Sequence, residues 1–133
     1  MIDKKIIKIA SNTENYGAIR DHTHFSKLKN SICGDIIKVY LIVKKEKVIN
    51  FKYEGNSCIY CQASASLLAK NTKYKSVKSV KGFIENAKFF FNKKDALNNN
   101  NWKIFKKIMN KKNIARKNCL LLPLKTLLKA LNN

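Results

Sequence analysis

The chain has 133 residues, enough for a single domain with its own core over residues 1–133, and 45% of them are hydrophobic. No hydrophobic run approaches the ~20 residues that span a bilayer, which argues against a membrane-spanning protein. Lysines interrupt the apolar N-terminal residues too often for a signal peptide, so we expect a cytoplasmic protein with no membrane partner.

The formal net charge of +20 favours partners that carry phosphate or acidic groups. Among the 28 basic residues, however, only Arg20 and Arg116 are arginine, the side chain best suited to bidentate reading of bases and phosphates. The lysines are also spread along the chain, and a joint excess of Lys, Asn and Ile is typical of a genome rich in A and T. Nucleic acid is therefore not the favoured partner, and a basic nucleic-acid-binding module with a structural zinc site is kept as the alternative function.

The first half of the chain predicts a short helix followed by a β-hairpin. Isoleucines at helical spacing indicate an amphipathic helix over residues 1–10. Residues 11–32 are mostly polar and are expected to be irregular. Alternating apolar residues then predict strands over 36–43 and 48–53, joined by a polar turn at 44–47. The inward-facing side chains are expected to be Ile2, Ile6 and Ile9 in the helix, Ile37, Val39, Leu41 and Val43 in the first strand, and Ile49, Phe51 and Tyr53 in the second.

The second half predicts helices, so the fold class is α+β: a small antiparallel sheet of about three strands packed against helices. Helices are expected over 63–70 and 77–91, and again after a polar connection at 98–101. A last helix is expected over 120–131, with Pro123 in its first turn because proline has no amide hydrogen to donate. The apolar edges of the last three helices are Val77, Val80, Ile84, Ala87 and Phe91, then Trp102, Phe105 and Ile108, and finally Leu120, Leu124, Leu127, Leu128 and Leu131.

Four cysteines in a chain expected inside the cell favour metal binding or redox chemistry over a disulfide framework. Three of them fall where elements begin or end: Cys33 before the first strand, Cys58 after the second, and Cys119 at the start of the last helix. Asp35 follows Cys33 at strand spacing, so both side chains are expected on one side, and Gly34 between them lets the backbone turn closely around an ion. Three sulfur ligands and one carboxylate form a tetrahedral set suited to zinc, or a cradle for iron and sulfide.

Other side chains suggest further sites. Cys58 and Cys61 have the spacing of a glutaredoxin-like redox pair, but that motif needs a βαβ context and a proline facing the dithiol, and the one proline of the chain lies far downstream. Cys61 is interpreted as a packed thiol, with a role as a fourth sulfur ligand in place of Asp35 kept as an alternative. His22 and His24 form a His-x-His pair in the segment expected to be irregular, where exposed histidines are common.

Several short blocks follow one another along the chain: Asn15-Tyr16-Gly17, Cys33-Gly34-Asp35, the segment 55–66 around Cys58, and the segment 116–122 around Cys119. In this order they resemble the signature segments of the NifU/IscU-type iron–sulfur cluster scaffold family. The resemblance extends from Asn12 to Leu131. The long stretch before the last cysteine, with Arg116 three residues ahead of it, looks most like the SufU branch of that family.

The resemblance implies a SufE/NifU-like fold and a metal site whose ligands are Cys33, Asp35, Cys58 and Cys119. Its occupant is expected to be zinc or iron, with a [2Fe–2S] cluster bound transiently. The resemblance also implies a scaffold and sulfur carrier that receives persulfide sulfur from a SufS/IscS-like cysteine desulfurase and serves apo iron–sulfur client proteins. Cys58 or Cys119 is expected to accept the persulfide. Such a protein is not an enzyme in its own right, and zinc-dependent sulfurtransferase activity with the desulfurase is the enzymatic alternative.

Arg116 matches the arginine of the SufU branch and is expected to act at the site by pairing with Asp35 or with a thiolate. Together with the lysine that follows it and the N–H groups of a helix start, it is expected to favour the thiolate form of Cys119. The chain departs from the family pattern near the site, because Ser57 stands where the family usually has glycine and Cys61 where it usually has serine.

Overall fold

The computed structural model describes residues 3–93 and 100–132. Its sheet has three antiparallel strands in the order β1-β2-β3, and these are β1 His24–Lys29, β2 Ile36–Lys44 and β3 Lys47–Asn56. The helices are α1 Lys4–Ala10, α2 Ile59–Thr72, α3 Val77–Lys93 and α4 Lys117–Leu131, with the 3-10 helices η1 Asn100–Lys107 and η2 Lys111–Arg116. The predicted α+β class with a three-stranded antiparallel sheet is confirmed.

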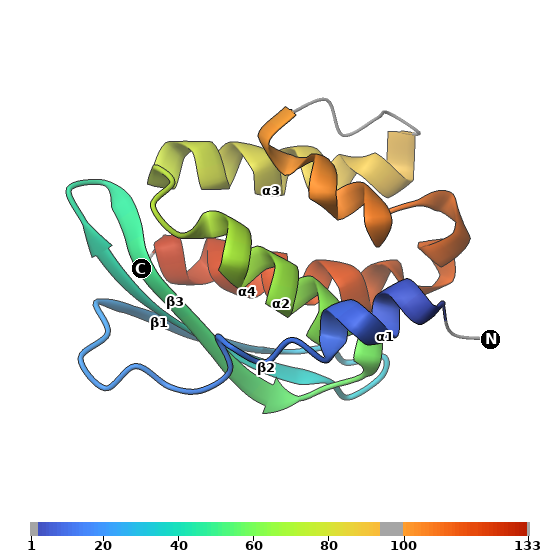
Figure 1. Ribbon diagram of the computed structural model, residues 1–133, viewed down its shortest axis with the longest axis horizontal. Coiled ribbons are helices and arrows are strands. Elements are labelled where there is room, and N and C mark those ends of the chain that lie inside the picture. The colour runs from blue at the N-terminus through green and yellow to red at the C-terminus, as the bar shows by residue number, and fades with distance from the viewer. Residues whose placement is uncertain (1–2, 94–99, 133) are drawn as a thin grey trace.

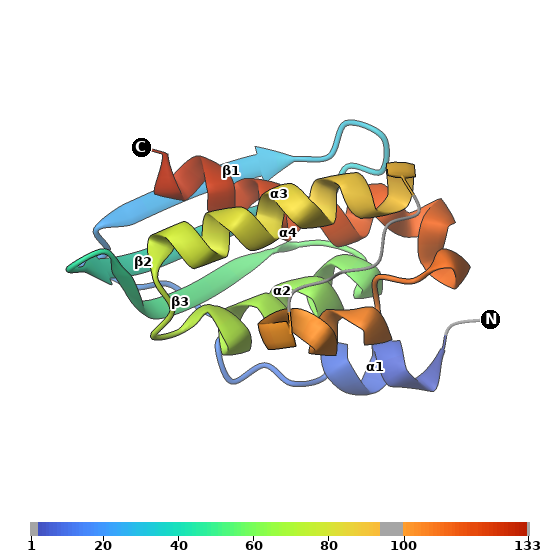
Figure 2. The same ribbon diagram turned by 90° about the horizontal axis from the view of Figure 1, so that it is seen from above.

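The helices form layers over the sheet. Figure 1 shows α2 and α4 lying against the sheet, with α3 and η1 farther from it. Seen from above in Figure 2, α3 runs over α4 while α1 and η1 lie beside α2. Every residue of α2 from 63 to 69 is buried, and most of these are Ala or Ser, whose small side chains let neighbouring elements approach closely. The position of α2 is therefore fixed from several sides.

The prediction of an irregular segment over 11–32 is wrong at its end, where β1 forms an edge strand. His24 is the first residue of this strand, and β1 pairs along its whole length with β2. Its buried inward residue is Ser26, whose hydroxyl donates a hydrogen bond to the Thr126 carbonyl of α4. A polar residue at the inward position hides the apolar alternation by which a strand is recognised.

The β2–β3 hairpin has a bulge that changes which side chains face the core. Lys45 and Glu46 have positive φ values of 50° and 63°, as a tight two-residue hairpin turn requires. The register shifts after Ile42, and Val48 rather than Ile49 is fully buried. The inward position predicted for Ile49 is therefore wrong, because one extra residue in β3 reverses the alternation. The other inward positions of both strands are buried or packed against the core, as predicted.

The predicted apolar edges of the helices are largely confirmed. The buried members are Ile6, Val80, Ile84, Ala87, Phe105, Ile108, Leu120, Leu124, Leu127 and Leu131. Ile2, residues 98 and 99, and the side chains of Phe91 and Trp102 lie outside the described part of the structure, and the end of the predicted connection already belongs to η1. Among the described helices, none combines the length and the apolar character that crossing a membrane would need.

Pro123 lies inside α4 and not in its first turn, because α4 begins at Lys117 directly after η2. Since proline has no N–H, the carbonyl of Cys119 four residues earlier has no helical donor. The next carbonyl, that of Leu120, accepts a hydrogen bond of 2.6 Å from the Ser64 hydroxyl of α2. Thus α2 supports α4 at the turn that the proline weakens, and Cys119 is the third residue of a helix instead of its cap.

Gly55 allows β2 and β3 to approach each other. A Cβ at this position would lie 2.1 Å from the Ile36 carbonyl oxygen on the neighbouring strand. We expect Gly55→Ala to lower the free energy of unfolding by about 2 kcal/mol or more, because the two backbones must separate. Urea unfolding followed by circular dichroism measures this change.

Gly82→Ala is the matched control for that substitution. Gly82 lies in α3, and a Cβ added there would meet no atom within 4 Å, so alanine should raise stability by about 0.5–1 kcal/mol. An unchanged stability in Gly55→Ala, or equal losses in both variants, would contradict the close approach at Gly55.

Candidate metal centre

Three segments distant in sequence meet at one end of the molecule, the right-hand end in Figure 1: the β1–β2 loop, the start of α2 and the start of α4. Here the ligand atoms of Cys33, Asp35 and Cys119 all lie within 4.8 Å of one another. The Sγ atoms of Cys33 and Cys119 are 3.9 Å apart. The structure therefore brings together three of the four side chains predicted as ligands.

The β1–β2 loop presents Cys33 and Asp35 through its own hydrogen bonds. The Asn30 N–H donates to the Asp35 carbonyl and the Gly34 N–H donates to the Asn30 carbonyl, both at 2.7 Å. Gly34 has a φ of +78°, in the left-handed region that favours glycine. The Asn30 side chain also accepts the Ile32 N–H at 3.0 Å. As a result Cys33 is held exposed on the loop, while Asp35 is buried.

Asp35 is the most informative side chain of the group. It is 8% exposed, and within the described part of the chain its Oδ2 atom has no hydrogen-bond partner. A buried carboxylate without a partner is costly unless a cation or a donor neutralises it. Contrary to expectation, Arg116 does not do so, because its guanidinium lies over the Tyr60 ring at 5.3 Å from the centroid. One buried carboxylate oxygen and nearby cysteine sulfurs form a donor set that fits zinc or iron.

The protein alone does not favour the thiolate expected at Cys119. Burial raises the pKa of the Cys119 thiol above its ordinary value, and the neighbouring thiols of Cys58 and Cys33 raise it further. Cys119 is 6% exposed within the first turn of α4, and desolvation is the largest cause of this rise. A bound cation would have to displace the thiol proton, and metal binding at this position is therefore coupled to proton release.

The other two cysteines lie at the start of α2. Cys58 is its N-cap, is partly buried, and contacts Cys119 closely enough to raise its pKa, although it stands outside the 4.8 Å group. Cys61 is fully buried, and burial raises the pKa of its thiol to about 12. A hydrogen bond with Ser57 lowers the Cys61 pKa. The negative charges of Asp35, Cys58 and Cys33 raise it. Cys61 is thus a packed thiol next to the group.

The His-x-His pair is not part of this group. The Nδ1 atom of His22 lies 2.9 Å from the Ile19 carbonyl, and its ring contacts aromatic side chains of β1 and β2. The Nδ1 atom of His24 lies 2.8 Å from the Thr23 hydroxyl. Local hydrogen bonds and ring packing account for both histidines.

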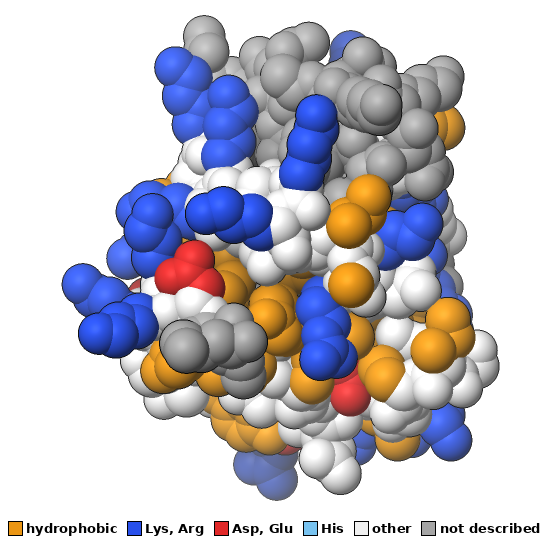
Figure 3. All heavy atoms as spheres, turned by 90° about the vertical axis from the view of Figure 1, so that its right-hand side faces the viewer, with side chains coloured by type: hydrophobic (Ala, Val, Ile, Leu, Met, Phe, Trp, Pro, Cys, Tyr) orange, Lys and Arg blue, Asp and Glu red, His pale blue; other side chains and the backbone are white. Residues whose placement is uncertain are grey.

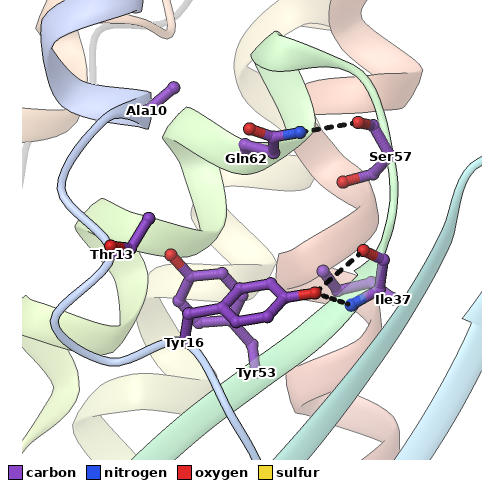
Figure 4. Close-up of a pocket in the computed structure, with 8 residues that line it drawn as sticks. Ala10, Thr13, Tyr16, Ile37, Tyr53, Ser57 and Gln62 are labelled. Atoms are coloured by element: carbon purple, nitrogen blue, oxygen red, sulfur yellow. Dashed lines mark hydrogen bonds between the residues drawn. The ribbon is translucent and has the colours of Figure 1, made fainter.

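A cavity of about 270 Å³ lies beside the start of α2 (Figure 4). Tyr16 and Tyr53 line it with ring centroids 5.6 Å apart, and the Tyr16 hydroxyl donates to the Gly55 carbonyl at 3.3 Å. The Tyr53 N–H also donates to the Asn15 carbonyl at 3.2 Å. The Asn15-Tyr16-Gly17 block therefore holds the end of β3, from which the chain runs on to Cys58.

Sequence reasoning missed residues that position the candidate ligands. Asn30 closes the ligand loop, Tyr60 holds the Arg116 side chain, and Ser64 bonds to the backbone of α4. Asparagine is common in turns, so the role of Asn30 has a signal in the sequence. The contacts of Tyr60 and Ser64 depend on tertiary packing and have none.

The surface around the candidate ligands combines apolar and basic side chains. Figure 3 faces this end of the molecule and shows hydrophobic side chains near its centre, surrounded by Lys and Arg with few acidic side chains. In the adjoining segments, Ile32 is 79% exposed in the β1–β2 loop and Ile114 is 49% exposed in η2. Exposed apolar side chains thus lie next to basic ones at this end of the molecule.

Comparison with known proteins identifies the family. The family model described as the NifU-like N terminal domain matches residues 1–133. The chain belongs to this family. The iron–sulfur cluster assembly scaffold protein IscU of Thermotoga maritima is 34% identical to this NifU-like domain over 87 residues, which cover 65% of the chain and 61% of that protein. The scaffold protein IscU 1 of Archaeoglobus fulgidus is 26% identical over 77 residues, covering 58% of the chain and 50% of that protein. The chain thus spans 61% and 50% of the lengths of these curated relatives.

Solved structures share the fold of this NifU-like domain. A crystal structure of the protein proposed as the iron–sulfur cluster assembly scaffold of the SUF system in Fervidobacterium islandicum AW-1 has a TM-score of 0.90 at 25% identity, covering 98% of this chain and 96% of that one. The N-terminal part of a NifU-like protein from Brucella abortus has a TM-score of 0.89 at 20% identity, covering 98% and 91%. The resemblance to the NifU/IscU family is confirmed, and the first structure supports the SufU branch. No comparison supports the nucleic-acid-binding alternative.

Proposed function

We propose that this NifU-like domain is an iron–sulfur cluster assembly scaffold that accepts sulfur as a persulfide. One observation carries the proposal: the ligand atoms of Cys33, Asp35 and Cys119 lie within 4.8 Å of one another, with the buried Asp35 Oδ2 unpartnered in the described residues. Cys58, which contacts Cys119, is the proposed fourth ligand. The family and the scaffold names of its relatives support this assignment.

The proposed ligands divide into soft sulfurs and one hard carboxylate. Zinc or iron bound there would act as a Lewis acid that keeps the sulfurs in their thiolate form. Iron and sulfide, as a [2Fe–2S] cluster, are the cargo of the scaffold. The thiolates of Cys33, Cys58 and Cys119 are the strong ligands for this cargo, whereas Asp35 is the weaker one and allows the cargo to leave.

We propose Cys58 as the persulfide acceptor. Cys119 is 6% exposed, whereas Cys58 is only partly buried, and its side chain makes no capping hydrogen bond at the start of α2. Free N–H groups at a helix start stabilise the negative charge that develops on a sulfur during transfer. The Cys58 sulfur is therefore reachable by a partner while it remains in contact with Cys119.

We propose that a SufS/IscS-like cysteine desulfurase and apo iron–sulfur client proteins bind the end of the molecule shown in Figure 3. Ile32 is exposed beside Cys33, and the surrounding Lys and Arg side chains favour a partner with acidic groups around an apolar patch. Arg116, stacked on Tyr60, is proposed to contact such a partner instead of the metal.

Anaerobic reconstitution with ferric iron and sulfide tests the scaffold function. Wild-type protein should gain the visible absorption and Mössbauer spectrum of a [2Fe–2S] cluster and pass the cluster to an apo-ferredoxin. Cys33→Ser should fail to do so because it lacks one sulfur ligand. Cys61→Ser, which removes the thiol outside the proposed ligand set, should still form the cluster. Equal cluster formation in Cys33→Ser, or none in the wild type, would overturn the proposal.

A further inference from the structure

Cys61 is a buried nucleophile that the proposed scaffold function does not use. It is fully buried and is the third residue of α2, three positions after the N-cap Cys58. The side chains of an N-cap residue and of the third helical residue face each other, as they do when they exchange hydrogen bonds in a capping box. The pair is therefore placed for chemistry between its own two sulfurs.

The first turn of α2 sets the spacing of this pair. The Gln62 N–H donates to the Cys58 carbonyl at 3.0 Å, so the turn that contains Cys61 is formed. Helical rise and rotation put Cα atoms three residues apart at about 5 Å. A disulfide joins Cα atoms about 4.4–6.8 Å apart. The Cys58 side chain makes no capping hydrogen bond to the helix backbone, so it can turn from its contact with Cys119 toward Cys61.

We infer that Cys61 resolves a persulfide carried by Cys58 and releases the outer sulfur as sulfide. This inference rests on the proposed function, in which Cys58 accepts the persulfide. The Cys61 sulfur attacks the Sγ atom of Cys58, a bond forms between these two sulfurs, and the bond to the outer sulfur breaks. The outer sulfur leaves with the Cys61 proton as hydrogen sulfide. In this step the outer sulfur takes up two electrons, and the sulfurs of Cys58 and Cys61 together give up two electrons and become a disulfide. An external dithiol then reduces the disulfide and restores both thiols.

The location of Cys61 suits this role better than that of the other thiols. A disulfide between Cys58 and Cys61 leaves Cys33, Asp35 and Cys119 free to hold iron while sulfide is released beside them. Burial shields Cys61 from reagents in solution, so it reacts with a sulfur that is delivered on its own helix. Because the Cys58 and Cys61 side chains are close, the reaction does not require a large fraction of Cys61 in the thiolate form. No glutaredoxin-like fold is needed, because the sulfur to be reduced is already attached to Cys58.

Sulfide release from a defined persulfide tests the inference. The full-length variant Cys33→Ser with Cys119→Ser keeps Cys58 and Cys61 as its only thiols, and a partner variant additionally carries Cys61→Ser. Both are treated with sodium polysulfide, desalted and checked for folding by circular dichroism. Sulfide is then assayed over time, and the cysteines are mapped by mass spectrometry. Release should be at least about tenfold faster with Cys61 present, as expected for an intramolecular nucleophile.

The products separate the outcomes. With Cys61, the expected product is the Cys58–Cys61 disulfide, lighter by two hydrogens than the dithiol; with Cys61→Ser, Cys58 should retain the extra sulfur. Equal release rates in both variants, with persulfide formed on Cys58, would overturn the inference alone. A disulfide between Cys33 and Cys119 in the persulfide-loaded wild-type protein, with Cys61 still a free thiol, would also overturn the inference alone. Failure of Cys58 to take up sulfur in either variant would overturn the proposed acceptor function as well.

Discussion

Asp35→Ala should make the metal-free protein more stable, by about 1–2 kcal/mol, because it removes a buried acceptor that has no partner. The same substitution should slow the release of bound zinc or cluster to a chelator by roughly tenfold or more, the scale on which single groups around a metal change its binding. A carboxylate exchanges with water more readily than a thiolate, so its removal takes away the weakest ligand of the set. Urea unfolding and chelator-transfer kinetics measure the two effects.

Asp21→Ala is the matched control, because Asp21 is an exposed aspartate outside the candidate site. It should change neither stability nor release. If Asp35→Ala releases metal at the wild-type rate, Asp35 is not a labile ligand. If the metal-free form of Asp35→Ala is less stable than the metal-free wild type, the unpartnered Oδ2 atom of Asp35 does not destabilise the folded protein as inferred from its burial.

Cys119→Ser should weaken zinc binding by more than about a hundredfold, beyond the range seen when only an outer partner of a metal ligand is lost. Cys119 lies within 4.8 Å of both Cys33 and Asp35, so a hydroxyl in its place would leave the proposed site without its central sulfur. Competition with a chromogenic chelator measures the affinity, and circular dichroism establishes that the variant is folded.

Cys61→Ser makes the same chemical change at another buried cysteine of the chain. It should bind zinc with wild-type affinity, because the proposed ligand set does not include Cys61. A large loss of affinity in Cys61→Ser as well as in Cys119→Ser would favour the alternative in which Cys61 is the fourth sulfur ligand in place of Asp35.

The sequence predicted which candidate ligands converge because each lies at the end of a regular element. Cys33 and Asp35 precede β2, and Cys119 lies in the first turn of the last helix, positions that strand alternation and helical periodicity locate within a few residues. The antiparallel hairpin and the amphipathic helices then leave few ways to bring these ends together. The family resemblance added the expectation that the sequence blocks around Cys33, Cys58 and Cys119 contribute to one site. Periodicity gives no information on which distant blocks meet.

Several features could not be predicted because tertiary contacts override local pattern. β1 places Ser26 inward against α4, so no apolar alternation marks it. The bulge before Val48 depends on strand pairing, and Pro123 is tolerated inside α4 where Ser64 of α2 supports a neighbouring carbonyl.

The electrostatics of the site also depend on tertiary packing. Charge counting placed Arg116 against Asp35 or a thiolate, whereas the structure stacks it on Tyr60. The thiolate expected at Cys119 stays a prediction for the metal-bound site, because burial raises the pKa of that thiol in the protein alone. Burial and side-chain direction decide both points, and neither can be read from the spacing of residues in the sequence.

X-ray absorption spectroscopy of the zinc-loaded protein tests the ligand set most directly. The wild-type protein should hold about one zinc per chain, bound by sulfur ligands and one lighter atom in the tetrahedral arrangement typical of such sites. In Asp35→Cys the lighter atom should be replaced by a fourth sulfur, since zinc accepts four thiolates. A shell made only of nitrogen and oxygen atoms in the wild type, or a lighter atom retained in Asp35→Cys, would contradict the proposal that Asp35 and the converging cysteines form the metal centre.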